Sequence, residues 1–135
     1  MAISLENYQS VLLALALYRE ARGCSDDAKL AVAWAIRNRS QDPRDRWPKT
    51  ISGVILQRWQ FSSFNPDSTD AVFPVPPDAA WDSCCSIVDG LEASTDPTAG
   101  AQFYHSIPYG QVIPRWAQEY PLTTTIGPFR FYRQP

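Results

Sequence analysis

Seven consecutive apolar residues, at positions 11–17, constrain the fold of this chain more than any other segment. The run is too short to cross a bilayer and too apolar for a helix with one face in water. We therefore expect a buried helix over residues 4–22, with Ser4 as its N-cap and Gly23 just beyond its last turn. We do not expect an export signal, because Glu6 is the only charge before the run.

Glu20, in the last turn of this expected helix, continues one of its apolar faces. It lies three, four and seven residues beyond Leu17, Ala16 and Leu13, so all four side chains share one side of the helix. A carboxyl group on an apolar face loses hydration when it is charged, so its pKa is expected to rise. A raised pKa is what a general acid for glycosidic cleavage needs near neutral pH. The alternative is an ordinary solvated residue at a helix end.

The segments that follow predict further helices joined by long loops. Ser25 is placed to cap a second helix that runs to residue 40, and Thr50 is placed to cap a short helix over 51–57. A third long helix is expected over about 78–93, after a loop over 65–78.

Two segments near the C-terminus predict a small β element. These are residues 101–106 and 123–133, on either side of a proline-punctuated loop that contains Trp116. Residues 58–64 are also expected to be extended or to form a hairpin. The twelve prolines indicate that much of the chain forms ordered loops without regular secondary structure. The chain is thus expected to form a single, mainly helical α+β domain over residues 1–135.

Composition excludes several classes of function. With a net charge of -2 the chain has no basic signature, so nucleic acid is not an expected partner. The apolar share of 44% and the charged share of 19% fit a soluble globular domain, expected to be a monomer without membrane insertion. Its three cysteines, Cys24, Cys84 and Cys85, form neither a disulfide framework nor the spacing of a zinc site. One disulfide from Cys24 is the alternative, but the odd count favours reduced thiols and synthesis in a cytoplasm.

Several short segments, in a fixed order along the chain, resemble the motifs of a known protein family. They are YREARG (18–23), AVAWAIRNR (31–39), TISGVILQRWQFS (50–62), DPTAGAQFYH (96–105), PRWA (114–117) and IGPFRFY (126–132). Together they make the chain similar to the spore-cortex-lytic type of cell-wall hydrolase. Two residues depart from the pattern: Phe129 stands where such proteins usually have a histidine, and Arg19 where a glycine is common.

The resemblance implies a lysozyme-like fold and an enzyme that cleaves peptidoglycan between N-acetylmuramic acid and N-acetylglucosamine. It implies a lytic transglycosylase with one catalytic carboxyl group, Glu20, and no metal or cofactor. The nearest other acids, Asp26, Asp27, Asp67 and Asp70, fall outside the matching motifs. A single carboxyl group would protonate the glycosidic oxygen and then deprotonate the sugar's own 6-hydroxyl, which gives a 1,6-anhydro product.

Six residues are predicted to contact the glycan: Gln60, Phe61, Ser62, Tyr104, His105 and Trp116. The amide of Gln60 and the hydroxyl of Ser62 suit sugar acetamido and hydroxyl groups, with turn hydrogen bonds as the alternative. By analogy with other lysozyme-like transglycosylases, Tyr104 would reach the acid or the adjoining sugar, unless it is a core residue. Trp116 offers a face for stacking a sugar ring, whereas Trp34 and Trp81 are expected in the core.

Two other functions remain open at this point. Cys24, just before a helix N-terminus, and His105 are candidates for the thiol and imidazole of a peptidoglycan amidase or endopeptidase. A non-catalytic glycan-binding module would keep the fold without the activity. We expect the protein to be made in the cytoplasm and to act on the cell wall, as a phage lysin or a virion component. The alternative is a bacterial protein exported by another route.

Overall fold

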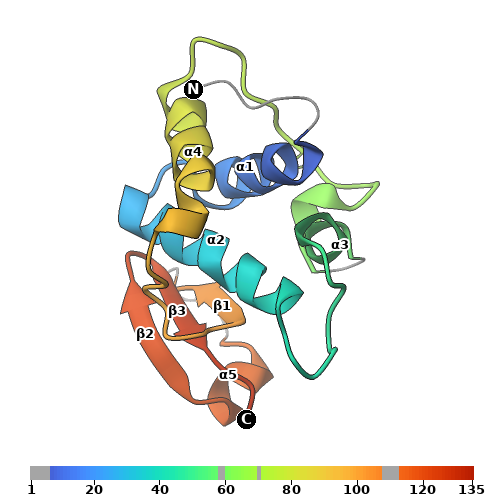
Figure 1. The fold of residues 1–135 in the computed structure, drawn as a ribbon, viewed down its shortest axis with the longest axis vertical. Coiled ribbons are helices and arrows are strands. Elements are labelled where there is room, and N and C mark those ends of the chain that lie inside the picture. Colours follow the sequence, from blue (N-terminus) through green and yellow to red (C-terminus); the bar gives the residue numbers. More distant parts are fainter. Residues whose placement is uncertain (1–6, 58–59, 70, 108–112) are drawn as a thin grey trace.

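The structure, a computed structural model, describes residues 7–57, 60–69, 71–107 and 113–135. Its helices are α1 (Tyr8–Ala21), α2 (Asp26–Ser40), α3 (Ile51–Leu56), α4 (Ala79–Asp89) and α5 (Arg115–Glu119), with the 3₁₀ helices η1 (Ser62–Phe64) and η2 (Leu91–Ala93). In Figure 1, α2 lies between a small sheet on one side and α1, α3 and α4 on the other. The predicted class, mainly helical α+β, is confirmed.

Side-chain caps begin several helices where the sequence predicted a start. Ser25, Thr50 and Asp78 each accept a hydrogen bond from the amide three residues further on, at 3.3, 3.0 and 3.1 Å. Each bond satisfies an amide that has no partner within its helix. The N-cap predicted for the first helix, Ser4, lies outside the described residues, and α1 is described from Tyr8 onward.

The single helix predicted over residues 78–93 is in fact two helices. α4 ends at Asp89 and η2 begins at Leu91, with Gly90 between them. Glycine is about 1 kcal/mol less favourable than alanine inside a helix, so the α-helix gives way there to a tighter turn. That turn still buries Leu91, which is 2% exposed.

The hydrophobic core lies where α1 meets α2, α3 and α4. Leu13, Ala16 and Leu17 are at most 1% exposed, which confirms the apolar face predicted for the first helix. Trp34 is also buried, as predicted, and its indole N–H donates to Ser94 Oγ at 2.9 Å. Within the described ranges, no helix has both the length and the apolar character needed to span a membrane.

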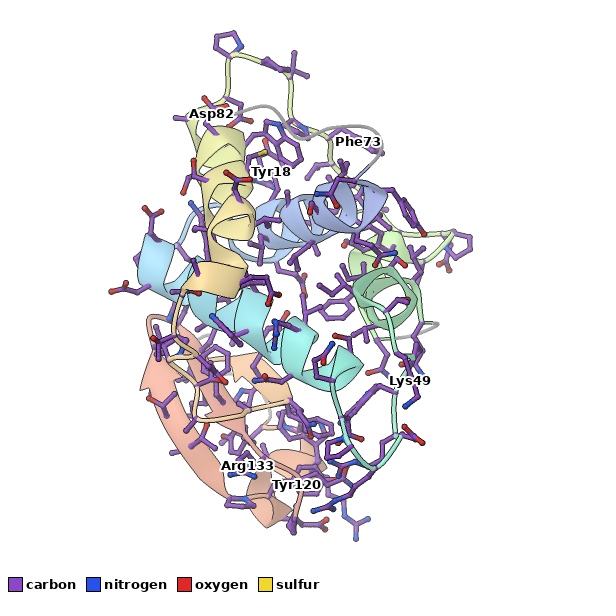
Figure 2. All side chains as sticks on the ribbon, viewed as in Figure 1. Tyr18, Lys49, Phe73, Asp82, Tyr120 and Arg133 are labelled. Atoms are coloured by element: carbon purple, nitrogen blue, oxygen red, sulfur yellow. The ribbon has the colours of Figure 1, made fainter. Side chains whose placement is uncertain are left out.

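Tyr18 joins the last turn of α1 to the start of α4. Its hydroxyl donates to Asp78 Oδ2 at 2.6 Å, and its ring meets Trp81 edge to face, with 6.1 Å between ring centroids. Figure 2 labels Tyr18. The hydrogen bond raises the pKa of Tyr18 and lowers the pKa of Asp78. Trp81, predicted in the core, is half-buried against it. These contacts fix the turn of α1 that carries Glu20.

The sheet has the order β1–β3–β2, and both pairs of strands are antiparallel. Its strands are β1 (Phe103–Ser106), β2 (Leu122–Ile126) and β3 (Phe129–Tyr132), which confirms both β segments predicted near the C-terminus. β2 and β3 meet at a turn in which Gly127 has a φ of 56°, a conformation that favours glycine. A Cβ atom at Gly127 would lie 3.1 Å from that of Ala28, so the turn packs closely on α2.

Asp96 fixes the loop that leads into β1. Its carboxylate accepts hydrogen bonds from the amide and hydroxyl of Thr98 at 2.7 and 2.6 Å, and from the Gly100 amide at 3.0 Å. The side-chain amide of Asn38, on α2, donates to the same carboxylate at 2.9 Å and to the Ala101 carbonyl at 3.0 Å. Burial alone would raise the pKa of Asp96, but these hydrogen bonds lower it. Asp96 thereby connects α2 to the start of the sheet.

The segment over 58–64, predicted to be extended or a hairpin, is helical in part. Ser62–Phe64 form the 3₁₀ helix η1, while residues 58–59 lie outside the described ranges. The carbonyl of Ser63 accepts a hydrogen bond from Arg19 Nη1 at 3.1 Å. The prediction was wrong because this contact with α1, distant in sequence, outweighs the local preference for an extended strand.

Candidate active site

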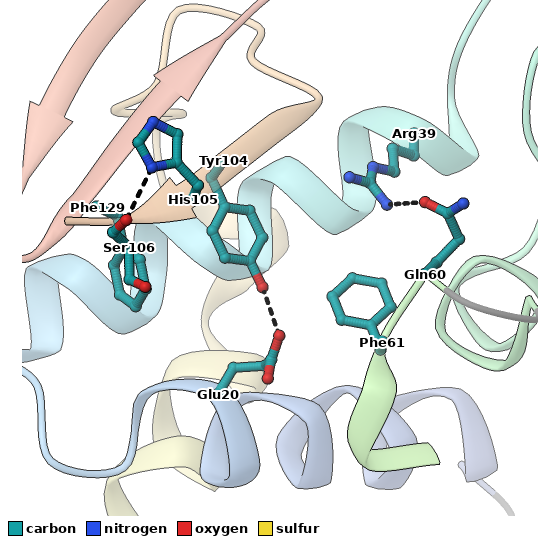
Figure 3. Close-up of a pocket in the computed structure, with 8 residues that line it drawn as sticks. All are labelled: Glu20, Arg39, Gln60, Phe61, Tyr104, His105, Ser106 and Phe129. Carbon is teal, nitrogen blue, oxygen red and sulfur yellow. Dashed lines mark hydrogen bonds between the residues drawn. The ribbon is translucent and has the colours of Figure 1, made fainter. Parts of the chain in front are cut away.

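Glu20 lies at the open end of the buried face of α1. Its side chain is half-exposed, whereas the three apolar residues that precede it on that face are buried. It borders a pocket of about 310 Å³ that opens between α1, α2, the segment before η1, and the sheet (Figure 3). The pocket is lined by Glu20, Arg39, Gln60, Phe61, Tyr104, His105, Ser106 and Phe129.

Tyr104 holds the Glu20 carboxyl group from across the pocket. Its hydroxyl donates a 3.0 Å hydrogen bond to Glu20 Oε1 (Figure 3). Its ring is positioned by Phe129 and Phe131, with centroids 5.4 and 5.8 Å away. Burial raises the pKa of Tyr104 well above its ordinary value, the charge of Glu20 adds to this effect, and Arg39 opposes it. The phenol therefore stays protonated and acts as a donor that orients the carboxyl group.

Arg39 brings a buried positive charge to the same pocket. Its Nε donates to the Gln102 carbonyl at 2.5 Å, and its Nη1 donates to Gln60 Oε1 at 3.4 Å (Figure 3). Three aromatic rings surround the guanidinium at 5.4 to 5.6 Å: Trp47, Phe61 and Phe103. Burial lowers the pKa of Arg39, but arginine begins so high that it remains charged at neutral pH. The pocket thus contains a fixed cation as well as an acid.

Two residues of the sheet complete the pocket. Phe129, in place of the histidine expected from the resemblance, is 4% exposed and forms an apolar wall. His105 has a contact at each ring nitrogen: Nδ1 lies 2.8 Å from the Ser106 carbonyl oxygen, and Nε2 lies 3.0 Å from the Tyr132 hydroxyl. The orientation of the imidazole is therefore set by the sheet.

Glu20 also borders a second, smaller pocket of about 160 Å³. This pocket is lined by Arg19, Glu20, Arg22, Ser62, Ser63, Thr69 and Val72. These residues belong to the last turn of α1 and its end, to η1, and to the loop that follows η1. Glu20 lines both pockets, so open space adjoins this residue on two sides.

Glu20 carries the only carboxylate among the described residues that line either pocket. Of the other acids weighed from the sequence, Asp26, Asp27 and Asp67 line neither pocket, and Asp70 lies outside the described residues. The described part of the chain also has no group of three His, Cys, Asp or Glu side chains placed to hold a metal ion. The geometry supports chemistry by one carboxyl group with a phenol and a guanidinium nearby.

The six residues predicted to contact the glycan lie in three places. The first pocket contains four of them: Gln60, Phe61, Tyr104 and His105. Ser62 lines the second pocket. Trp116, in α5, lines neither, and its ring packs against Phe103 and Tyr132 with centroids 5.2 and 5.3 Å away. The ring proposed for sugar stacking is thus in contact with other aromatic residues.

Arg39 lines the pocket but was not among the predicted site residues. The signal that identified Glu20 would also have found it. Arg39 lies three, four and seven residues beyond Ile36, Ala35 and Val32, all of which are at most 1% exposed. A charged residue that continues an apolar face of a helix is therefore informative at both positions.

The three cysteines are free. Cys84 and Cys85 are buried in α4, and burial raises the pKa of Cys84 to about 11. Cys24 is half-buried between α1 and α2 and lines neither pocket. Since the described contacts of the His105 nitrogens are with Ser106 and Tyr132, the thiol–imidazole pair considered from the sequence is not assembled among the described residues.

The fold matches those of solved catalytic domains. The catalytic domain of germination-specific lytic transglycosylase SleB from Bacillus anthracis aligns with a TM-score of 0.75 at 24% identity, over 98% of this chain and 100% of that one. The catalytic domain of the Bacillus cereus SleB protein aligns with a TM-score of 0.69 at 26% identity, over 94% and 91% of the two chains. The fold therefore places the chain in the structural class of these catalytic domains.

The sequence matches the family model of cell wall hydrolases over residues 23–132. The protein belongs to this family, which confirms the resemblance found in its motifs. The matched segment begins after Glu20, so the role of Glu20 rests on the geometry of the pocket. No curated protein sequence matches the chain significantly.

Proposed function

We propose that this protein cleaves the glycan strands of peptidoglycan as a lytic transglycosylase, with Glu20 as both acid and base. The observation that carries the proposal is the place of Glu20, a half-exposed carboxyl group between two pockets, held by the Tyr104 hydroxyl. Membership of the cell wall hydrolase family supports the substrate, and the activity named for the B. anthracis domain supports the reaction.

The first step is acid catalysis at the glycosidic bond. Protonated Glu20 would donate its proton to the glycosidic oxygen as the bond from that oxygen to C1 of the muramoyl residue breaks. The N-acetylglucosamine side leaves with this proton as a hydroxyl group, and the muramoyl ring acquires oxocarbenium character. The Tyr104 hydroxyl would then stabilise the carboxylate that Glu20 has become, because a hydrogen bond to an ionised acceptor is stronger than one to a neutral acceptor.

The second step uses the same carboxylate as a base. Glu20 would take the proton of the muramoyl C6 hydroxyl while the C6 oxygen bonds to C1 and closes the 1,6-anhydro ring. This restores protonated Glu20 and consumes no water. A hydrolase of the two-carboxylate type would instead need a second carboxyl group roughly 5 to 10 Å away. The described pocket residues include no such group besides Glu20, which supports the intramolecular route.

The decisive test is Glu20→Gln, which keeps the shape of the side chain and removes the acid. We expect the variant to fold and to clear a peptidoglycan suspension at least about 100-fold more slowly than the unchanged protein. Glu92→Gln is the matched control, because Glu92 is an exposed glutamate bound to Arg37 on the surface, and it should keep full activity. Clearing by Glu20→Gln at the rate of the control would overturn the proposal.

The products distinguish transglycosylation from hydrolysis. Mass spectrometry of the released fragments should show muramoyl ends with the 1,6-anhydro group, lighter by one water than reducing ends. Reducing ends alone would mean that water is the acceptor and would contradict the single-carboxylate route.

The two rival functions predict different results in the same assays. A non-catalytic glycan-binding module would clear nothing. A cysteine-dependent amidase or endopeptidase would release peptides rather than glycan fragments, and it would stay active after Glu20→Gln.

A further inference from the structure

We propose that the second pocket beside Glu20 is a subsite for a carboxylate carried by the muramoyl residue, bound by Arg19 and Arg22. This inference rests on the proposed function, since it assigns a ligand group to the strand being cut. It concerns the pocket of about 160 Å³ that is lined by Arg19, Arg22, Ser62 and Thr69 as well as Glu20.

Arg19 is held in place before any ligand arrives. Its Nε donates to the Val72 carbonyl at 3.0 Å and its Nη1 donates to the Ser63 carbonyl at 3.1 Å. The guanidinium also lies over two phenyl rings, 4.5 Å from the centroid of Phe64 and 4.8 Å from that of Phe73. A planar guanidinium fixed in this way loses little freedom on binding and still has N–H groups beyond the two that are used.

The same contacts build the pocket. Ser63 and Val72, whose carbonyls Arg19 binds, both line it, and they come from η1 and from the loop after it. Arg19 therefore joins α1 to two segments that are distant in the chain.

Arg22 supplies the second cation from the end of α1. Its side chain is exposed, and its guanidinium lies 5.3 Å from the centroid of the Tyr18 ring. Within the described residues it forms no ion pair. Among the described residues that line the pocket, Arg19 and Arg22 are cations and Glu20 is the one carboxylate, while Asp78, outside the pocket, interacts electrostatically with Arg22. This balance favours a negatively charged group on a ligand.

The substrate provides such a group at regular intervals. N-acetylmuramic acid differs from N-acetylglucosamine by a lactyl group, whose carboxyl is either free or joined to a peptide that carries carboxylates of its own. A muramoyl residue flanks every bond of the proposed type, so the carboxylate arrives beside Glu20 in each productive complex. Among its described lining residues, the first pocket has the single buried guanidinium of Arg39, whereas the second has Arg19 and the exposed Arg22.

The test compares glycan strands that differ only in their carboxyl groups. Peptide-free strands with free lactyl carboxylates, the same strands after conversion to methylamides, and peptide-bearing strands are digested, and anhydro products are counted to obtain kcat and KM. We expect KM on carboxylate-bearing strands to be about tenfold lower than on methylamides, because charge-assisted hydrogen bonds are lost in the amide. Arg22→Gln should remove this preference by raising KM, with kcat unchanged and with no effect on the methylamides.

Arg19→Gln should also raise KM on the carboxylate-bearing strands. If the Arg19 variant fails to fold, the result with Arg22→Gln decides the test. Arg133→Gln is the matched control, because Arg133 is exposed at the opposite end of the molecule from Phe73 (Figure 2) and should behave like the unchanged protein. If Arg22→Gln raises KM on peptide-free strands with free carboxylates, the ligand is the lactyl carboxylate. If Arg22→Gln raises KM on peptide-bearing strands alone, the ligand is a carboxylate of the peptide.

Equal KM values on carboxylate and methylamide strands, with no change in Arg22→Gln, would overturn the subsite and leave the proposed function standing. Failure of the unchanged protein to cut any of the strands would instead overturn the proposed function and the subsite with it.

Discussion

The hydroxyl of Tyr104 lies 3.0 Å from Glu20 Oε1, so a residue of the sheet positions an acid on a helix that precedes it by 84 residues. We expect Tyr104→Phe to lower kcat roughly tenfold to a hundredfold, because a hydrogen bond to a charged group contributes about 1.5 to 3 kcal/mol. KM should change little, since the ring remains in place. Tyr8→Phe, at an exposed tyrosine of α1, is the control and should have no effect. Equal rates for the two variants would contradict a positioning role for Tyr104.

Asp96 should be a strong determinant of stability. Its carboxylate accepts hydrogen bonds from Asn38, Thr98 and Gly100, which orders the loop into β1. We expect Asp96→Ala to lower the free energy of unfolding by about 3 kcal/mol, because several donors lose their acceptor at once. Urea denaturation measures the loss. Asp89→Ala, at an exposed aspartate at the end of α4, should change the free energy by less than about 0.5 kcal/mol.

The charge of Asp42 should make the stability of the fold depend on pH. It accepts hydrogen bonds from Arg46 at its amide, Nε and Nη2, at 3.0, 3.0 and 2.9 Å, and from Gln102 at 3.1 Å. The Arg46 hydrogen bonds hold the pKa of Asp42 well below its usual range. In the unfolded state the pKa of an aspartate is about 3.9. Because the pKa of Asp42 is lower in the folded state, its ionised carboxylate stabilises the fold at pH values above the unfolded pKa, and this stabilisation is lost as the pH falls from there towards the folded pKa.

Asp42→Asn should therefore cost about 3 kcal/mol at pH 7, and the difference from the unchanged protein should narrow below about pH 4. Asp45→Asn is the matched control. Like Asp42, Asp45 forms an ion pair with the residue four positions later, Lys49, but both of these side chains are exposed. We expect it to cost less than about 1 kcal/mol. A constant difference between pH 3 and pH 7 for Asp42→Asn would show that Asp42 does not act through its charge.

The thiols should react in a definite order. Cys84 and Cys85 are buried, and burial raises the pKa of both, to about 11 for Cys84. At pH 8 we expect iodoacetamide to modify Cys24 alone in the folded protein, and all three cysteines in urea. Peptide mass mapping identifies the sites. Peptidoglycan clearing should survive this modification, and its loss would support the cysteine-dependent alternative.

The sequence predicted the elements whose signals are local. Ser25 and Thr50 cap helices as expected, and the apolar spacing from Leu13 to Leu17 correctly placed Glu20 at the end of a buried face. Such features depend on residues within one or two turns of each other. They can therefore be found without knowing how the chain folds back on itself.

Features that depend on distant contacts were missed. The strand predicted near residue 60 became η1 because Ser63 accepts a hydrogen bond from Arg19, which lies 44 positions away. The contacts of the Trp116 ring with Phe103 and Tyr132 could not be foreseen either, and its predicted contact with a sugar stays a prediction. Arg39 is a different case, because its spacing beyond buried Ile36, Ala35 and Val32 is a local signal of the kind that identified Glu20, and only the pocket formed with β1 depends on distant contacts.

The space on both sides of Glu20 has a consequence for how a cell wall would fail. A carboxyl group at the bottom of a blind cavity can act only on a chain terminus, whereas one open on two sides can be reached by the middle of a long polymer. Under the proposed activity, cuts would fall at interior linkages, and each would release the tension carried by a whole strand. The mesh would then lose mechanical strength after few events, so a suspension of walls should lose turbidity well before small soluble sugars accumulate.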